Sequence, residues 1–370
     1  MVGLATALVD AGHEVLFATA PPLDAMIRFD GFAVEAVGLS EDQIRELRAM
    51  DAVYTEMSAA PRRGRMAAFT RSFAGFEVPP RLDGLRRLVR EWRPDLIVYE
   101  SAEFAGPLAA ELDGLPSVHH AFGPLVEAEV MAAAGAVAAA HWAGNGLPEP
   151  DRGGMYRGLY LDIVPPSLRP SHLATIPHVQ AIRPVPVQGA AAETPPWLLE
   201  LGSRPVILVT FGTVFNKRLN LYHAVIDGLR GLDADVVITT GRSEAARSLA
   251  DLPPNIQMHE WVPWAPMLAR SSVVVSHGGA SSTLGPLAFG LPLVLIPISA
   301  DHFTNADAAA AAGAATVLDA QTVNGDDLRR AVATAFSEPA TISARQIAAE
   351  IADMPPPESV VDILASAAAG

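Results

Sequence analysis

Residues 273–285 carry the pattern that could most directly do chemistry: Val-Val-Val-Ser-His-Gly-Gly-Ala-Ser-Ser-Thr-Leu-Gly. An apolar run typical of a buried strand ends at a histidine and two glycines, and hydroxyl residues then open a helical pattern. Glycines let backbone N–H groups approach an anion, and a helix N-terminus adds partial positive charge. The pattern predicts a phosphate or pyrophosphate site at His277, Gly278, Gly279, Ser281 and Ser282. The alternative is an ordinary strand-to-helix turn in which the hydroxyl residues cap the helix.

Three further polar segments of the second half also follow apolar runs. Trp261 offers a flat face on which a base can stack, and the backbone of Val262 can read the edge of that base. The alternative for Trp261 is a ring that covers the core. Asp301 and His302 can bind sugar hydroxyls, although an Asp before a helix is also a common N-cap. Thr213 follows another such run and could lie near the same phosphates.

The first half has its own candidates for chemistry. Glu100 follows the apolar run 96–99 and could orient a histidine that acts as a general base, or it could cap a helix. His119 and His120 follow the next turn, and strand alternation lets only one of them face a cleft. We expect residues 40–80 and 120–155 to shape an acceptor pocket. Phe76 could contribute to it, although its spacing from Phe69 and Phe73 favours the core stripe of a helix.

A metal site is not expected. Asp233 and Asp235 form an Asp-x-Asp string, but they precede the apolar run 236–238 and so lie at the wrong end of a strand. His13-Glu14 is not followed by a second histidine at metal-binding spacing. We therefore expect no metal and no cofactor.

Short β-branched runs alternate with helical stretches along most of the chain, and this alternation predicts parallel sheets covered by helices on both faces. The runs are 15–18, 96–99, 206–209, 236–238, 273–275 and 293–296. The clearest helix has an apolar stripe from Leu82 to Trp92. The fold class is therefore α/β. The carboxyl ends of such strands bind ligands, which places the polar segments above where a site is expected.

Two doubly wound domains are predicted. Residues 96–116 and 273–292 share the order strand, helix, Gly-Leu-Pro and strand, which places Glu100 and His277 at equivalent strand ends. We expect domains at 1–185 and 201–355, a linker at 186–200 where proline density argues against helix, and a C-terminal helix at 356–370 that packs back on the first domain. Because the chain opens in a helical pattern, we expect a strand before Met1; the alternative is a chain that simply begins with a helix.

The length, charge and composition of the chain indicate which kinds of partner and cellular location to expect. The chain has 370 residues, a net charge of −15, 50% hydrophobic residues and no cysteine. The negative charge argues against nucleic acid and anionic membranes as partners. No signal peptide is visible, and the apolar stretch around 130–140 is shorter than the ~18 residues that span a bilayer. We expect a cytoplasmic protein with small-molecule partners, and a homodimer as its assembly.

Together these segments resemble the nucleotide-sugar motif of family 1 glycosyltransferases, which have the GT-B fold. The resemblance is carried by Ser276–Thr283, by Trp261-Val262-Pro263 before it and by Asp301-x-Phe303-x-Asn305-Ala306 after it. It continues through 11–15, 93–98, 164–168 and 183–186, so it covers nearly the whole chain. The bacterial antibiotic-tailoring enzymes, particularly the calicheamicin glycosyltransferases, are the most similar members that we recognise.

The resemblance implies two Rossmann-like domains that face each other across a cleft. It implies a metal-independent, inverting hexosyltransferase that moves a (deoxy)sugar from a dTDP-sugar to a hydroxyl of a hydrophobic aglycone. It also implies that the glycosylated products are enediyne or polyketide antibiotics of actinomycetes. Trp261 would stack on the base, His277, Gly279 and Ser282 would hold the diphosphate, and Asp301 would contact the sugar. Glu100 would orient a base histidine expected a few residues before Met1.

Some residues depart from the family pattern. Ser281 stands where a glycine is usual, Trp264 where glutamine is common, and His302 where a glutamine usually follows the aspartate. These departures bear on the phosphate contacts and on the choice of sugar. Two alternatives to an active transferase follow. One is a catalytically silent nucleotide-sugar-binding auxiliary protein, and the other is a different GT-B enzyme such as a nucleotide-sugar epimerase.

Overall fold

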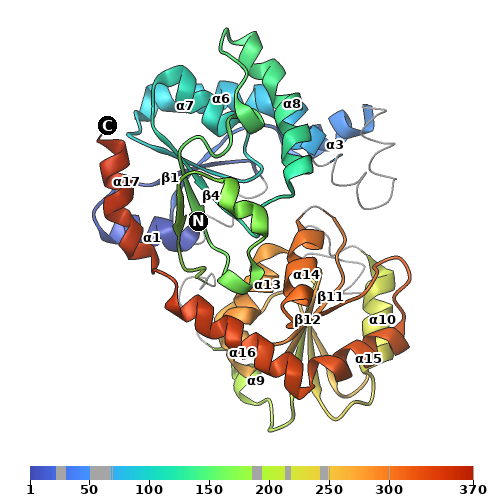
Figure 1. Ribbon diagram of the computed structural model, residues 1–370. Coiled ribbons are helices and arrows are strands. Elements are labelled where there is room, and N and C mark those ends of the chain that lie inside the picture. Colours follow the sequence, from blue (N-terminus) through green and yellow to red (C-terminus); the bar gives the residue numbers. More distant parts are fainter. Residues whose placement is uncertain are drawn as a thin grey trace. The chain divides into compact units, whose positions relative to one another are not determined.

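The computed structural model divides the chain into two compact units (Figure 1). The first comprises Met1–Ile163, Pro170–Arg183 and Pro355–Gly370, and the second comprises Val164–Arg169 and Pro184–Met354. The residues that the structure describes are 1–21, 31–50, 68, 70–185, 194–212, 218–241, 249, 251–299 and 301–369.

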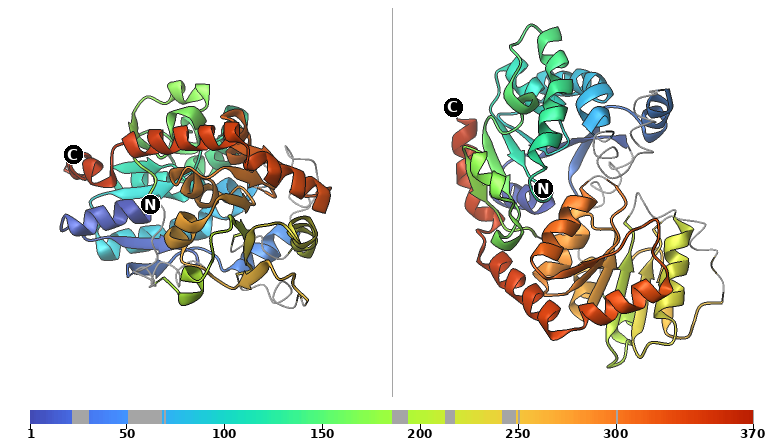
Figure 2. Two further views of the ribbon diagram at one scale, coloured as in Figure 1. Left: turned by 90° about the horizontal axis from the view of Figure 1, so that it is seen from below. Right: turned by 45° about the vertical axis from the view of Figure 1, so that its right-hand side comes forward.

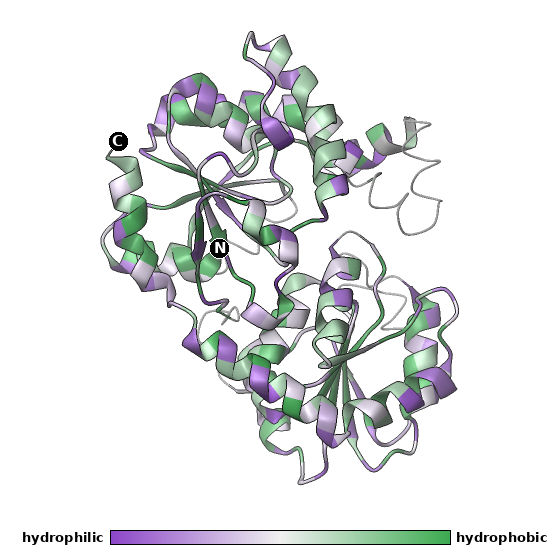
Figure 3. Cartoon of the chain, viewed as in Figure 1, coloured by the Kyte–Doolittle hydropathy of each residue, from purple (hydrophilic) through white to green (hydrophobic). Residues whose placement is uncertain are grey.

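The second unit is built on a six-stranded parallel sheet with the order β12-β11-β10-β7-β8-β9. Its strands are β7 (Val206–Thr210), β8 (Asp235–Thr239), β9 (Ile256–His259), β10 (Val273–Ser276), β11 (Leu293–Leu295) and β12 (Ala315–Val317). The central strands are apolar along their length and buried, because helices cover both faces of the sheet. Figure 3 shows these strands in the colour of hydrophobic residues. The strand order reverses between β7 and β10, which is where open α/β sheets bind ligands.

Helices connect and cover these strands, and the two views of Figure 2 show them on either side of the sheet. They are α9 (Pro196–Leu199), α10 (Leu219–Leu229), α12 (Trp264–Arg270), α13 (Ala280–Ala288), α14 (His302–Ala311), α15 (Gly325–Ala335) and α16 (Glu338–Asp353), with the 3₁₀ turn η3 (Pro166–Leu168). The main core lies between the sheet, α10 and α15, and includes Ile207, Leu221, Val236 and Leu328, each buried.

The described part of the first unit holds a two-stranded parallel sheet, β1-β2, and a four-stranded parallel sheet, β3-β4-β5-β6. The strands are β1 (Leu16–Thr19), β2 (Ala33–Ala36), β3 (Ile97–Glu100), β4 (Ser117–His120), β5 (Leu159–Asp162) and β6 (Val179–Ala181). The helices are α1 (Val2–Asp10), α3 (Glu41–Met50), α6 (Val78–Trp92), α7 (Ala105–Asp113), α8 (Ala128–Gly144) and α17 (Val361–Ala368), with the short helices η1 (Ser72–Phe76), η2 (Asp151–Gly154), η4 (Ser171–Thr175) and η5 (Pro357–Val360).

The C-terminal residues belong to the first unit. Val360 and Leu364 share a buried cluster with Leu4 of α1 and with Val118 and Leu161 of the four-stranded sheet. Burying aliphatic side chains of this size stabilises a fold by about 1.5–3 kcal/mol each. The last helix is therefore part of the hydrophobic core of the first unit, although most of the second unit separates it in the sequence from the rest of the first.

The prediction of an α/β protein with parallel sheets in two domains is confirmed. The predicted linker lies partly outside the described residues, at 186–193, and the exclusion of helix from it is wrong. The short helix α9 starts at Pro196, because proline is tolerated in the first turn of a helix, where no backbone N–H bond is lost. Residues 164–169 join the second unit: the backbone N of Ser167 donates to Glu350 Oε2 at 2.8 Å. The strand expected before Met1 stays a prediction.

Candidate functional site

The imidazole of His277 lies at the point where the strand order of the second unit reverses. It follows the end of β10, and Gly212 follows the end of the neighbouring strand β7. A Cβ atom at Gly212 would come within 2.7 Å of His277 Cε1, and a Cβ atom at Gly279 within 2.7 Å of its Nε2. The ring therefore fits between two glycines, and no larger residue could replace either one without moving it.

Burial also sets the charge of His277. Only 9% of the residue is exposed, and burial lowers the pKa of its imidazole to about 4. At neutral pH the ring is uncharged and carries one N–H. It contributes no full positive charge to a bound anion, and a hydrogen bond to the backbone of Thr210 partly opposes the effect of burial on its pKa.

The turn after His277 is held by its own side chains. Gly278 has a φ of +83°, which glycine adopts without strain, and its N–H donates to Ser276 Oγ at 3.2 Å. Ser282 Oγ donates to the carbonyl of Gly279 at 3.0 Å. Because Gly279 is the N-cap of α13, the alternative in which hydroxyl residues cap this helix is wrong. Ser281 lies exposed in the first turn, so that side of the helix start is open to a ligand, whereas the backbone of Ala280 hydrogen-bonds the Asp301 carboxylate.

Asp301 lies in the next turn of the sheet, after β11, at the N-cap position of α14. Its side chain makes no capping bond. Oδ2 accepts instead from Nδ2 of Asn305 at 2.8 Å. Burial raises the pKa of Asp301 to about 6, against the opposing effect of hydrogen bonds from Asn305 and from the backbone of Asp301 and Ala280. The carboxyl group is thus ionised at neutral pH but titrates in mildly acidic solution.

His302 is oriented toward His277. The two rings are 4.6 Å apart between centroids and nearly perpendicular, and only 4% of His302 is exposed. Its Nδ1 accepts from the backbone N–H of Ser299 at 3.3 Å and of Ile298 at 3.4 Å. Burial, followed by the neighbouring His277, lowers the pKa of His302 to about 3. Since Nδ1 is an acceptor, the proton of the neutral ring is on Nε2.

Trp261 is 58% exposed in the turn after β9, whereas Val262 beside it is buried. A ring this exposed does not cover a core, so the alternative interpretation of Trp261 as a ring that covers the core is wrong. Strand β9 is three strand spacings from β10, roughly 14 Å across the same edge of the sheet. An extended ligand with a ring at one end and an anion at the other could reach both positions. Thr213 lies outside the described residues.

In the first unit, Glu100 ends β3 and lies opposite His120 in the parallel pairing with β4. Its Oε2 accepts from the backbone N of Ala102 at 2.8 Å. The first N–H of α7, at Ala105, donates to Glu103 Oε1 at 2.9 Å. Glu100 therefore bonds the turn before the helix, and Glu103 rather than Glu100 bonds the first helical N–H.

The two histidines of β4 are part of the core. His119 is 1% exposed, its Nε2 lies 2.9 Å from Ser101 Oγ, and its ring packs against those of Tyr99, Tyr156 and Tyr160. Burial lowers the pKa of both His119 and His120 to about 3. Both stay neutral at physiological pH, and His120 donates from Nδ1 to the carbonyl of Ala121 at 2.6 Å. Phe76 ends η1 and is half-buried, and Phe69 lies outside the described residues.

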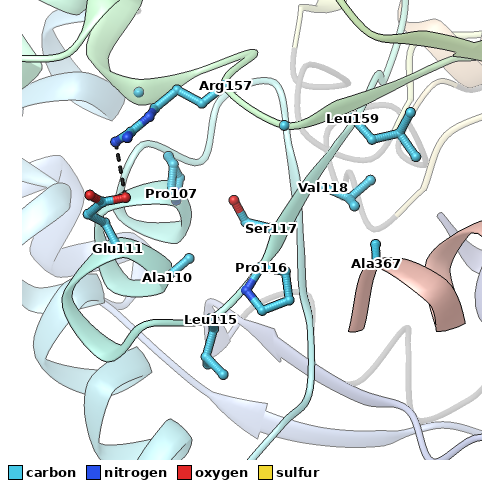
Figure 4. Close-up of a pocket in the computed structure, with 12 residues that line it drawn as sticks. Pro107, Ala110, Glu111, Leu115, Pro116, Ser117, Val118, Arg157, Leu159 and Ala367 are labelled. Carbon is cyan, nitrogen blue, oxygen red and sulfur yellow. Dashed lines mark ion pairs between the residues drawn. The ribbon is translucent and has the colours of Figure 1, made fainter. Parts of the chain in front are cut away.

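A pocket of about 300 Å³ in the first unit lies apart from all these residues (Figure 4). Ser117 and Leu159, the first residues of β4 and β5, line it, together with the ion pair of Arg157 and Glu111 at 3.1 Å. It is therefore at the amino edge of the sheet, whereas Glu100 is at the carboxyl edge. None of the predicted site residues lines this pocket.

The described residues contain no group of three or more metal-ligating side chains. Asp235 begins β8 and pairs with Arg204, so this acid of the Asp-x-Asp string is at the amino edge of the sheet. No described helix is both long enough and apolar enough to cross a membrane. The expectation that no metal is required stays a prediction.

Sequence reasoning missed the part played by Asn305. Asn305 belongs to the motif Asp301-x-Phe303-x-Asn305-Ala306, but the sequence pattern predicts no role for it. Its side chain joins the turn after β10 to the turn after β11 through two hydrogen bonds of 2.8 Å, to the carbonyl of Gly278 and to Asp301 Oδ2. Its spacing of four residues from Asp301 within one helix was the available signal.

The chain matches two family models described as erythromycin biosynthesis protein CIII-like. The N-terminal domain model matches residues 6–212, and the C-terminal domain model matches residues 223–367. Among curated proteins, an L-demethylnoviosyl transferase of Streptomyces niveus is 33% identical over 379 residues, covering 99% of this chain and 94% of the relative. An aklavinone 7-beta-L-rhodosaminyltransferase of Streptomyces galilaeus is 29% identical over 409 residues, covering 98% and 91%.

Solved structures of glycosyltransferases superpose on nearly the whole chain. A spinosyn rhamnosyltransferase superposes with a TM-score of 0.80 at 26% identity, covering 98% of this chain and 95% of that one. The glycosyltransferase SnogD of Streptomyces nogalater gives a TM-score of 0.74 at 27% identity, covering 99% and 94%. The rhamnosyltransferase has also been solved with thymidine diphosphate and with spinosyn aglycone.

Proposed function

Because the chain belongs to the erythromycin biosynthesis protein CIII-like family of glycosyltransferases, we propose that it moves a (deoxy)sugar from a dTDP-sugar to a hydroxyl group of a natural-product aglycone. It is a GT-B glycosyltransferase that uses a nucleotide-sugar donor, and its relatives act in antibiotic biosynthesis. The identity of the nucleotide, the hydroxyl acceptor and inversion at the anomeric carbon are the parts that we propose.

The observation that carries the proposal is the enclosed imidazole of His277 between Gly212 and Gly279, beside the open first turn of α13. Backbone N–H groups and a helix N-terminus beside a neutral imidazole together suit a diphosphate. Trp261 lies exposed at the same edge of the sheet and suits a base. The solved complex of a related rhamnosyltransferase with thymidine diphosphate supports thymine as that base.

The proposed reaction is a single displacement. The acceptor oxygen forms a bond to the anomeric carbon as the bond from that carbon to the diphosphate oxygen breaks. The electron pair leaves on dTDP, and the proton of the acceptor hydroxyl passes to a general base. His277, the N–H of Gly279 and the first turn of α13, with Ser281 and the backbone of Ser282, stabilise the charge that develops on the leaving diphosphate, so no metal is required. Gly278 contributes the left-handed conformation of the turn.

Two acidic residues have separate tasks in this scheme. Asp301, ionised at neutral pH, accepts hydrogen bonds from sugar hydroxyls, and His302 lies beside it at the sugar. Glu100, at the carboxyl edge of the first unit's sheet, orients the general base. For the hydrophobic aglycone we propose Phe76, which is half-buried. We leave out His119, because three tyrosines enclose its ring.

Calorimetric titration of the protein with TDP, with UDP and NAD as comparisons, tests the donor site. We expect selective micromolar binding of TDP. Absence of TDP binding by folded protein would overturn the proposal.

Incubation with dTDP-sugars and a panel of hydroxylated aglycones then tests the reaction, and the anomeric configuration of the product, read by NMR, tests inversion. We expect transfer with inversion, and retention would refute the single displacement. TDP binding without transfer to any aglycone would favour the auxiliary binding protein instead.

A further inference from the structure

Asn305 donates both protons of one buried amide to two parts of the proposed donor site. It lies in α14, no part of it is exposed, and Nδ2 is 2.8 Å from the carbonyl oxygen of Gly278 and 2.8 Å from Asp301 Oδ2. Both partner atoms are acceptors at neutral pH, so only the amide nitrogen can face them. The chemistry of the partners therefore fixes the orientation of the side-chain amide.

The other half of this amide is left without a partner. Oδ1 of Asn305 is buried and accepts no hydrogen bond from the described residues. A buried acceptor without a donor costs stability, and an apolar side chain of similar size would avoid that cost. The two donated bonds are thus what an asparagine contributes at this position.

The bond to Gly278 sets the direction of the next N–H. In a trans peptide the carbonyl of one residue and the N–H of the following residue point in opposite directions within one plane. With the carbonyl of Gly278 turned toward the buried Asn305, the N–H of Gly279 points away from it. The N–H of Gly278 is held as well, by Ser276 Oγ at 3.2 Å, so the peptides on both sides of this residue are fixed.

From this geometry we infer that Asn305 is a positioning residue, which aims the Gly279 N–H at the diphosphate and holds the Asp301 carboxylate toward the donor sugar. The inference rests on the proposed function and adds to it a residue that touches neither ligand. One side chain then couples the phosphate part of the site to the sugar part.

A matched control is present in the same unit. Asn255 is 8% exposed, and its Nδ2 donates to the carbonyls of Leu229 at 3.0 Å and Ala234 at 3.3 Å. It precedes β9 and bonds the chain before β8, so it lies at the amino edge of the sheet. Asn255 and Asn305 thus both donate from a buried side-chain amide, at opposite edges of the sheet, although Oδ1 of Asn255 also accepts from the N–H of Gly231 at 3.2 Å. If Asn305 served folding alone, substitution of either residue would lower stability without a selective loss of TDP affinity.

The test measures TDP affinity by calorimetry and unfolding by urea for the unsubstituted enzyme, Asn305→Asp and Asn255→Asp. We expect both variants to lose stability and only Asn305→Asp to weaken TDP binding, by about tenfold or more, because a hydrogen bond to a charged ligand is misaligned. Equal TDP affinity in the two folded variants would overturn the inference. Absence of TDP binding by the unsubstituted enzyme would overturn the proposed function itself.

A second variant gives a readout that a purely structural role would not move. Asn305→Ser is smaller and removes the paired donation; it also serves if Asn305→Asp does not fold. The hydrogen bond from Asn305 lowers the pKa of Asp301, so its loss should shift the acidic limb of the kcat/KM profile for the donor to higher pH. The neighbouring His277 and His302 stay neutral across that range. An unshifted limb, with TDP affinity equal to that of Asn255→Asp, would refute the positioning role.

Discussion

The turn after β3 in the first unit and the turn after β10 in the second have the same construction but different contents. Each strand is followed by a nine-residue helix, α7 or α13. A left-handed glycine follows each helix: Gly114, with a φ of 67°, comes directly after α7, and Gly290, with a φ of 69°, comes two residues after the end of α13. The residue after each glycine then donates back into the last helical turn, Leu115 to Ala110 at 2.9 Å and Leu291 to Pro286 at 3.1 Å.

The difference lies between strand and helix. In the first unit residues 101–104 are Ser-Ala-Glu-Phe, and the carboxylates of Glu100 and Glu103 accept from the backbone of the turn and of the helix start. In the second unit residues 277–279 are His-Gly-Gly, and Ser276 rather than His277 stands at the place of Glu100, because each ends its strand and accepts from the backbone N–H two residues further on. The equivalence of Glu100 and His277 expected from the sequence is therefore off by one residue. His277 is the first residue of its turn, and its imidazole is neutral at neutral pH. A helix N-terminus attracts negative charge in both cases. In both units a carboxylate accepts from the backbone at the helix start, that of Glu103 in the first and that of Asp301 in the second. Only in the second unit do glycines beside the helix start leave room for an anionic ligand as well.

This comparison shows that a shared βαβ pattern does not by itself define a ligand site. Charge and side-chain bulk in a few turn residues decide whether the strand end binds an anion or repels it. The following substitutions test whether the turn after β3 serves the general base and the turn after β10 binds the donor.

Glu100→Gln should lower kcat by about 100-fold or more, because a residue that orients the general base acts in the transition state. TDP affinity should change little, since the donor site is assigned to the other unit. Steady-state kinetics together with TDP calorimetry measure both effects. Glu103→Gln removes an acid from the same turn and serves as the control. A matching loss of TDP affinity in Glu100→Gln would give Glu100 a structural role instead.

Gly279→Ala should weaken TDP binding by about 100-fold, because the added Cβ would lie 2.7 Å from His277 Nε2 and displace the ring. Gly202→Ala is the matched control in the same unit, where an added Cβ has no neighbour within 4 Å. TDP titration of both variants measures the difference. Unchanged affinity in Gly279→Ala would show that the enclosed imidazole does not contribute to binding.

Trp261→Ala should weaken TDP binding by roughly 5- to 150-fold, which corresponds to the ~1–3 kcal/mol typical of base stacking on an aromatic ring. Trp92→Ala provides the comparison, because Trp92 is also exposed, at 39%, but belongs to the first unit. If the two variants bind TDP equally well, Trp261 is not the stacking platform.

The smallest effect is a dependence on pH. With the pKa of Asp301 raised to about 6, its carboxylate is lost as the pH falls through that value. The kcat/KM for the donor should then fall up to tenfold per pH unit below 6, and a pH profile measures it. Asp301→Asn should abolish this limb; if the limb persists, it arises from another group.

The raised pKa of Asp301 affects the free energy of unfolding in the opposite direction from its effect on kcat/KM. The folded state holds the proton of Asp301 more tightly than the unfolded state, whose pKa is near the ordinary 3.8. The contribution of this group to stability therefore falls as the pH rises from about 4 to about 6. Urea unfolding across this range should show Asp301→Asn free of the decline.

Much of the fold follows from local pattern. The β-branched runs at 206–209 and 273–275 become fully buried central strands, because a run that is apolar on both faces fits only between two layers of helices. The stripe from Leu82 to Trp92 is part of α6, which starts earlier, at Val78. Proline misled the prediction near residue 196, since its effect on a helix depends on its position within the first turn.

The sequence alone determined which residues meet at the strand ends, because parallel strands bring their carboxyl ends to one edge and the order of strands and helices fixes that edge. How those residues are used depends on contacts that form only in the folded chain. Folding encloses His277 between Gly212 and Gly279, which are 65 and 2 positions away in the sequence. It packs the His119 ring among tyrosines and places the amide of Asn305 between two turns. The physical reason is that burial, pKa and hydrogen-bond direction depend on neighbours that are distant in the chain.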